Sequence, residues 1–67
     1  MTITLNNHER EIPEQTSVQF FLNHFIGEMQ NGIAVAVNET VIPKAQWAYY
    51  VLQSNDKVLV IKATQGG

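Results

Sequence analysis

The sequence contains no cysteine, few charged residues and no long apolar run, and each absence narrows the possible functions. Without cysteine there is neither a disulfide framework nor a thiolate metal site, and any sulfur chemistry must proceed without a side-chain thiol. Only 15% of the residues are charged, as four basic and six acidic side chains scattered singly. Because no basic stripe is available to meet a phosphate backbone, we do not expect nucleic-acid binding.

The chain is also too short for an elaborate active site. Its 67 residues form one domain, which buries only about 60% of the surface that its unfolded form exposes. Such a thin core favours a carrier or binding module over a stand-alone enzyme. No apolar run approaches the roughly 20 residues of a membrane span, and no basic segment followed by an apolar one begins the chain. We therefore expect a soluble, unprocessed, cytoplasmic protein that does not contact membranes.

The first part of the chain predicts a hairpin. Apolar residues alternate with threonines over residues 1–5, as in a half-buried strand. The segment 6–8 is rich in asparagine, which tolerates turn geometry, so residues 9–12 can return alongside as a second strand. Pro13 ends this pairing.

A single helix is predicted next, over residues 17–26. Thr16 and Gln19 have the spacing of a capping box. An apolar stripe that faces the sheet follows at helical spacing and consists of Val18, Phe21, Leu22, Phe25 and Ile26. Gly27 is placed to end the helix in the left-handed conformation.

The remaining segments predict more strands. Residues 33–37 alternate branched and small apolar side chains, residues 40–42 form a short extended piece, and residues 44–48 form one helical turn that carries Trp47. We expect Trp47 to pack in the core with its indole N–H on a backbone carbonyl. Residues 57–62 are apolar on both faces, which is typical of a strand in the middle of a sheet.

The predicted order is strand, strand, helix, strand, short strand, strand. This is the α+β arrangement of the ubiquitin-like β-grasp fold, with a mixed sheet of four to five strands and one helix across one face. We assign residues 1–62 to this domain and residues 63–67 to a flexible tail, whose five residues can extend roughly 17 Å. The tail ends in Gly66 and Gly67, whose lack of side chains lets backbone and carboxylate enter a narrow channel. The alternative is an inert frayed end.

Several segments resemble the small sulfur carrier proteins of thiamin (thiazole) biosynthesis, and the resemblance covers the whole chain. They are the strand end Val37-Asn38, the stretch Val41-Ile42-Pro43-Lys44-Ala45-Gln46-Trp47-Ala48, which is similar to a V-P-R-x-x-W-A pattern, the turn at Asp56, and Gly66-Gly67. The sequence departs from the family at Ile42, which separates Val41 from Pro43, and at Asn55, where the family usually has glycine. Asparagine tolerates positive φ, so the turn should survive.

The resemblance implies a chemistry for the tail. A ubiquitin-activating-like enzyme adenylates the carboxylate of Gly67, presented by Gly66, and the acyl-adenylate becomes a thiocarboxylate that gives its sulfur to thiazole synthase. The chain itself is then no enzyme but a protein co-substrate. It binds no cofactor, since ATP and magnesium belong to the adenylating partner, while a donor such as a cysteine desulfurase supplies the sulfur.

Partner contacts are expected along the tail and on the last strand. We assign them to Thr64 and Gln65, and to Leu59 and Ile61 as the apolar set on the sheet face that the helix leaves open. His8 and His24 have no acidic cluster nearby, so no metal site is expected. Three alternative functions stay open, namely a small subunit of molybdopterin synthase, a ubiquitin-like protein modifier and a non-covalent interaction domain.

Overall fold

The computed structural model describes residues 1–27 and 32–62. The elements in chain order are β1 (Thr2–Leu5), β2 (His8–Glu11), α1 (Val18–Phe25), β3 (Ile33–Val37), β4 (Thr40–Val41), the short 3-10 helix η1 (Lys44–Gln46) and β5 (Lys57–Lys62). The strands form one sheet with the order β2-β1-β5-β3-β4. The pair β1 and β5 is parallel and the other pairs are antiparallel. The predicted β-grasp order is confirmed, and β5 lies in the middle of the sheet.

The hairpin turns use asparagine where the backbone needs a positive φ. Asn6 and Asn7 have φ values of 49° and 70° in the turn between β1 and β2, and Asn38 and Glu39 have 51° and 70° between β3 and β4. Consecutive positive φ values match the right-handed twist of the flanking strands. Asn55, at φ 70°, confirms that the turn before β5 forms without the family's glycine.

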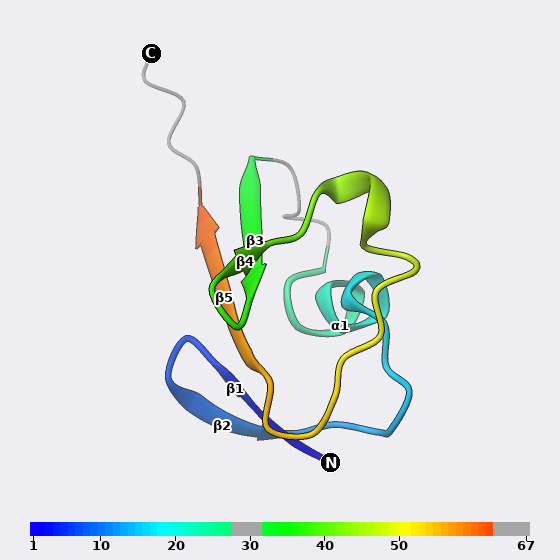
Figure 1. Ribbon diagram of the computed structural model, residues 1–67, viewed down its shortest axis with the longest axis vertical. Helices are drawn as coiled ribbons and strands as arrows, with labels where there is room; N and C mark the ends of the chain where they lie inside the picture. Colours follow the sequence, from blue (N-terminus) through cyan, green and yellow to red (C-terminus); the bar gives the residue numbers. More distant parts are fainter. Residues whose placement is uncertain (28–31, 63–67) are drawn as a thin grey trace.

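The core lies between one face of the sheet and α1 (Figure 1). Its buried side chains are Ile3, Ile12, Val18, Phe21, Leu22, Val35, Val37, Ile42, Trp47, Leu52 and Val58. Every strand of the central three contributes at least one of them, which is why the sheet and the helix stabilise each other. Ile26 packs against this core, but Phe25, at the last turn of α1, is 38% exposed and contradicts its expected burial.

The helix begins one residue later than the capping box predicted. Ser17, in extended conformation, is the N-cap, and its Oγ accepts a hydrogen bond of 3.1 Å from the Phe20 N–H. The buried hydroxyl of Thr16 instead donates to the Pro13 carbonyl at 2.6 Å. The Gln19 amide donates to Asn23 Oδ1 at 3.0 Å. At the other end, Gly27 confirms its predicted positive φ, at 70°.

The N-cap assignment predicts a specific loss of stability. Ser17→Ala removes the acceptor of the Phe20 N–H, and we expect the free energy of unfolding to fall by about 1 kcal/mol, the usual cost of losing a helix cap. Ser54→Ala is the matched control, because Ser54 is exposed in a turn, and it should change stability by less than about 0.5 kcal/mol. Urea unfolding measures both. Equal stability of the two variants would contradict the assignment.

Candidate functional site

Strand β5 determines where the candidate site can lie. It ends at Lys62, the last described residue, so the predicted tail residues Thr64, Gln65, Gly66 and Gly67 lie outside the described residues. Any partner that takes hold of residues 63–67 must approach the end of β5. The described part of the site is therefore the surface that β5 and its neighbours present.

The side chains of β5 alternate between the core and the opposite sheet face. Val58 is 3% exposed and Val60 packs against the core, whereas Leu59 and Ile61 are 44% and 52% exposed. The structure thus places Leu59 and Ile61 on the face that is turned away from α1, where they were expected. Their contact with a partner stays a prediction.

The neighbouring strands extend this apolar surface. In the strand register, Ala36 lies opposite Leu59, Ala34 lies opposite Ile61, and Val41 lies opposite Ala36. Directly paired residues point to the same side of a sheet, and Val41 is 66% exposed. We call this surface the open-face patch, and it consists of Ala34, Ala36, Val41, Leu59 and Ile61. A contiguous exposed apolar surface on a small domain is typical of a protein-binding site.

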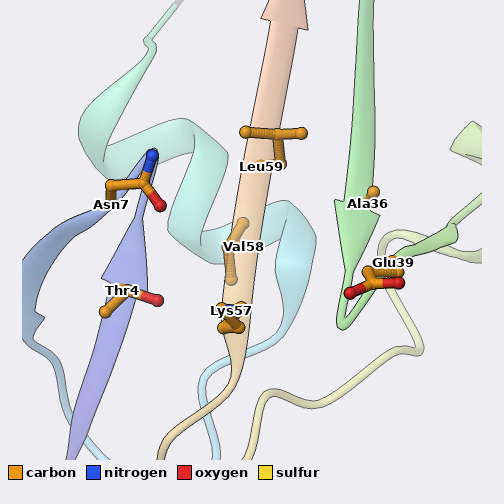
Figure 2. A pocket seen from close by; sticks show the side chains of 7 residues that line it. All are labelled: Thr4, Asn7, Ala36, Glu39, Lys57, Val58 and Leu59. Carbon is orange, nitrogen blue, oxygen red and sulfur yellow. The ribbon is translucent and has the colours of Figure 1, made fainter.

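The small side chain of Ala36 on β3 leaves a hollow beside Leu59 of β5. A depression of about 280 Å³ opens there, lined by Thr4, Asn7, Ala36, Glu39, Lys57, Val58 and Leu59. Figure 2 shows Leu59 and Ala36 on adjacent strands, with Lys57 lower on β5 and Glu39 beside the turn after β3. An apolar floor with one positive and one negative group at its rim suits a side chain of another protein.

A buried carboxylate holds the start of β5 against the turn after β3. Asp56 is 7% exposed, and its two oxygens accept hydrogen bonds from the Asn38 amide at 2.9 Å and from the Gln53 N–H at 2.8 Å. Asn38 in turn accepts from the Lys57 N–H at 3.0 Å. Because an unpartnered buried carboxylate would be costly, this network fixes Asn38, Asp56 and Lys57 relative to each other. The turn at Asp56 that carries the family resemblance is therefore structural.

Trp47 is likewise structural. Its side chain is 2% exposed, and its indole N–H donates to the Ile42 carbonyl at 2.9 Å, as predicted. Ile42, the residue that departs from the family pattern, is itself buried in the core. Within the most specific stretch of the resemblance, Ile42 and Trp47 therefore pack the domain, whereas Val41 is exposed and belongs to the open-face patch.

Within residues 1–27 and 32–62, no three His, Asp or Glu side chains gather as metal ligands. In the same ranges, no helix is long and apolar enough to cross a bilayer.

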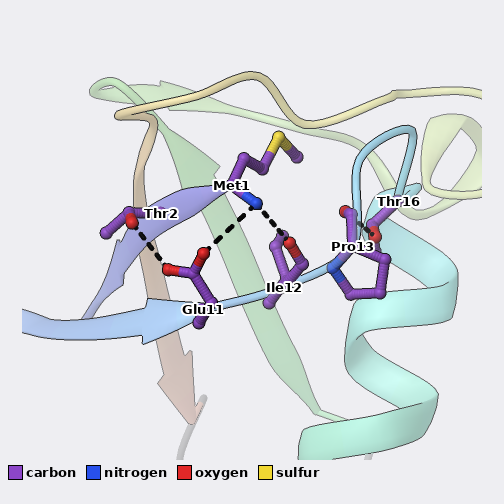
Figure 3. Close-up of polar contacts among 6 residues, drawn as sticks. All are labelled: Met1, Thr2, Glu11, Ile12, Pro13 and Thr16. Atoms are coloured by element: carbon purple, nitrogen blue, oxygen red, sulfur yellow. Dashed lines mark hydrogen bonds and ion pairs between the residues drawn. The ribbon is translucent and has the colours of Figure 1, made fainter.

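Among the residues that the structure describes, one titratable group has a shifted pKa, and it lies at the N-terminal corner of the sheet. Thr2 Oγ1 donates to Glu11 Oε1 at 2.7 Å, and the Met1 ammonium lies 3.6 Å from Glu11 Oε2 while it donates to the Ile12 carbonyl at 2.6 Å (Figure 3). The hydroxyl and then the ammonium lower the pKa of Glu11 below 4.5. Glu11 belongs to the edge strand β2, which β1 separates from β5, so this shift stabilises the hairpin and not the candidate site.

The strand order β2-β1-β5-β3-β4, the single helix and the open apolar face define a small ubiquitin-like protein of the β-grasp class. The crystal structure of a thiamine biosynthesis protein (ThiS) from Geobacter metallireducens has the same fold, with a TM-score of 0.89 and 19% identity over 100% of each chain. The sequence is also 28% identical to the sulfur carrier protein ThiS of Escherichia coli (strain K12), over 100% of both chains. The ThiS family matches residues 3–67. The protein belongs to the ThiS family of sulfur carriers.

The lowered pKa of Glu11 predicts a pH-dependent contribution to stability. A carboxylate with a lowered pKa in the folded state stabilises the fold fully above its unfolded value of about 4.5 and loses this effect as the pH falls through the lower folded value. We expect Glu11→Gln to reduce the melting temperature slightly at pH 7, and this difference should vanish toward pH 3.

Thermal unfolding of both proteins between pH 7 and pH 3 measures the effect. Glu9→Gln is the control on the same strand, because the Glu9 side chain makes no hydrogen bond or ion pair to the described residues. A Glu11→Gln difference that stays constant across this pH range would contradict the assignment.

Proposed function

We propose that this protein carries sulfur for thiazole formation in thiamin biosynthesis, as a thiocarboxylate on its C-terminal glycine, Gly67. The observation that carries the proposal is the family match, which runs through residue 67 and therefore includes Gly66 and Gly67. The Escherichia coli relative, aligned over its full length, is a sulfur carrier protein by name. Family membership assigns the class of function, and the chemistry of the tail follows from it as a proposal.

The chemistry suits a glycine carboxylate. At pH 7 a terminal carboxyl, with an ordinary pKa of roughly 3.3–3.7, is ionised and a poor electrophile. Transfer of AMP from ATP converts it into an acyl-adenylate, and attack of sulfur on the carbonyl carbon then expels AMP. A terminal glycine pair places no side chain beside the reacting carbon. The absence of cysteine leaves this carbon as the one place where the chain can hold a transferable sulfur.

The partners follow from the same chemistry. We propose a ubiquitin-activating-like adenylating enzyme, which supplies ATP and magnesium, a sulfur donor such as a cysteine desulfurase, and thiazole synthase as the acceptor. The open-face patch would dock the adenylating enzyme while residues 63–67 enter its active site. Leu59 and Ile61 lie on β5, the strand that leads into the tail, so one surface can bind the partner and direct the carboxylate.

Intact mass spectrometry tests the carrier chemistry. The purified chain is incubated with the adenylating enzyme of its host, ATP and sulfide. We expect a mass gain equal to the replacement of one oxygen by sulfur, and no gain in a variant that lacks Gly67. An unchanged mass, with the enzyme shown to be active on another carrier, would contradict the proposal. Ladders of protein conjugates in cell extracts would instead favour a ubiquitin-like modifier.

The docking surface makes a second prediction. Leu59→Thr replaces an exposed apolar side chain by a polar, β-branched one that suits a strand. We expect the KM of the adenylating enzyme for the carrier to rise about tenfold, because truncating an anchor side chain at an interface usually costs at least that much. ATP–pyrophosphate exchange measures the KM.

Tyr49→Thr is the matched control, since Tyr49 is 83% exposed and is not part of the open-face patch. It should leave the KM unchanged. The docking assignment would be wrong if Leu59→Thr, folded as shown by its circular dichroism, had the KM of the unmodified protein.

A further inference from the structure

The first turn of the chain reaches across the sheet to the last strand. β1 ends at Leu5, and the Asn6 N–H donates to the Val58 carbonyl at 2.9 Å. Further along β5, the contacts are made by the Asn6 side chain. Its Oδ1 accepts from the Val60 N–H at 2.9 Å, and its Nδ2 lies 3.4 Å from the Val60 carbonyl as a donor. We call these two contacts the Asn6 latch.

The latch acts as a substitute for one more residue of β1. Parallel strands pair through alternating N–H and C=O groups, and a side-chain amide offers one donor and one acceptor in the same spacing. Asparagine also tolerates the left-handed conformation that the turn requires, and Asn6 adopts φ 49°. Glycine would satisfy the turn but not the latch. Asn6 thus pairs with β5 across 54 positions of sequence.

The latch contacts the second half of β5, close to the end that leads toward the C-terminus. Val60 lies between Leu59 and Ile61 of the open-face patch, and only Lys62 follows before the tail. Beside the latch the surface is hollow, with a depression of about 270 Å³ lined by Leu5, Asn6, Ile26, Ile33, Val60 and Lys62. The Asn6 side chain is the described group that bridges β1 and β5 at this level.

We propose that Asn6 is a positioning residue for the reaction at the C-terminal carboxylate. The proposal rests on the carrier function proposed above. Through the latch, Asn6 adds a contact from the β1 side to the pairing of the second half of β5 with β3, and so fixes the direction in which β5 leads toward the C-terminus. A partner that is docked on the patch then receives the tail in register with its active site. Misplacement of a reacting group by about 1 Å can reduce a rate by up to about a hundredfold, so the loss of the latch is expected to affect turnover.

The test compares two asparagine-to-glycine variants in turns of positive φ. Asn6→Gly keeps the turn and removes the latch. Asn55→Gly is the control, because Asn55 also has positive φ, 70°, and its described contact is the backbone hydrogen bond of 2.7 Å to the Thr2 carbonyl, which glycine retains. In Asn6→Gly we expect the Val60 amide to exchange its hydrogen about tenfold faster. We expect kcat for adenylation to fall about tenfold with KM nearly unchanged, since the patch is intact. Asn55→Gly should match the unmodified protein in both measurements.

A second variant keeps the test decisive if Asn6→Gly folds poorly. Asn6→Asp keeps an acceptor for the Val60 N–H but sets a carboxylate oxygen against the Val60 carbonyl. Its Val60 protection and its kcat should therefore lie between those of the unmodified protein and those of Asn6→Gly. Rates are measured well below the unfolding temperature of each variant.

The measurements separate the possible results. Unchanged Val60 exchange in Asn6→Gly would overturn the latch, and an unchanged kcat despite faster exchange would overturn its positioning role. A kcat loss shared with Asn55→Gly would overturn it as well. If the unmodified protein is not adenylated at all, the carrier function fails, and with it the positioning role, while Val60 exchange still decides whether the latch exists.

Discussion

The insertion of β5 between β1 and β3 is the constraint on which the rest of the structure depends. The last strand pairs in parallel with Thr4 and Leu5 of β1 and antiparallel with β3, so it joins the two hairpins into one sheet. Its Val58 also enters the core beside Ile3 and Val37. Because these contacts span nearly the whole chain, the entropy of closing the loop is offset only when all of them form together. Folding of the domain and fixing of the strand that precedes the tail are therefore a single event.

The same strand joins the core to the candidate interface. A domain of this size cannot cover both faces of its sheet, since one helix is available for the described residues and it lies over the face with Val58 and Val60. Leu59 and Ile61 remain exposed at a cost in solubility, which a partner surface would offset. The alanines of β3 lie on the open face of the sheet as well. Small side chains on the open face leave a hollow beside Leu59, while the valines between them fill the core.

Periodicity predicted the elements, whereas contacts between distant segments decided the details. The alternation in β1 and β3 and the apolar stripe of α1 each carry a local signal, and so their faces were predictable. In β5 both faces are apolar, so the burial of Val58 and exposure of Leu59 followed only from its register with β3. The sequence spacing favoured Thr16 as helix cap, whereas Ser17 caps the helix and the Thr16 hydroxyl donates to the Pro13 carbonyl. The pairing of Asn38 with Asp56 and of Asn6 with Val60 carried no local signal at all.

Some of the turn asparagines do more than allow the positive φ of their turns. Asn6, Asn38 and Asn55 all occupy positive φ, where glycine would be less strained. Two of them also use their side chains on β5, since Oδ1 of Asn38 accepts from the Lys57 N–H and Oδ1 of Asn6 accepts from the Val60 N–H. In each hairpin, the side chain of a turn asparagine therefore accepts a hydrogen bond from β5. Asn38 does so at Lys57, at the start of the strand, and Asn6 does so at Val60, in its second half. Glycine at position 6 or 38 would preserve the hairpin turn and remove its side-chain contact with β5, which would still pair with β1 and β3. Among the described residues, the Asn55 side chain makes no such contact with β5, so only the positive φ of the turn restricts the residue type there.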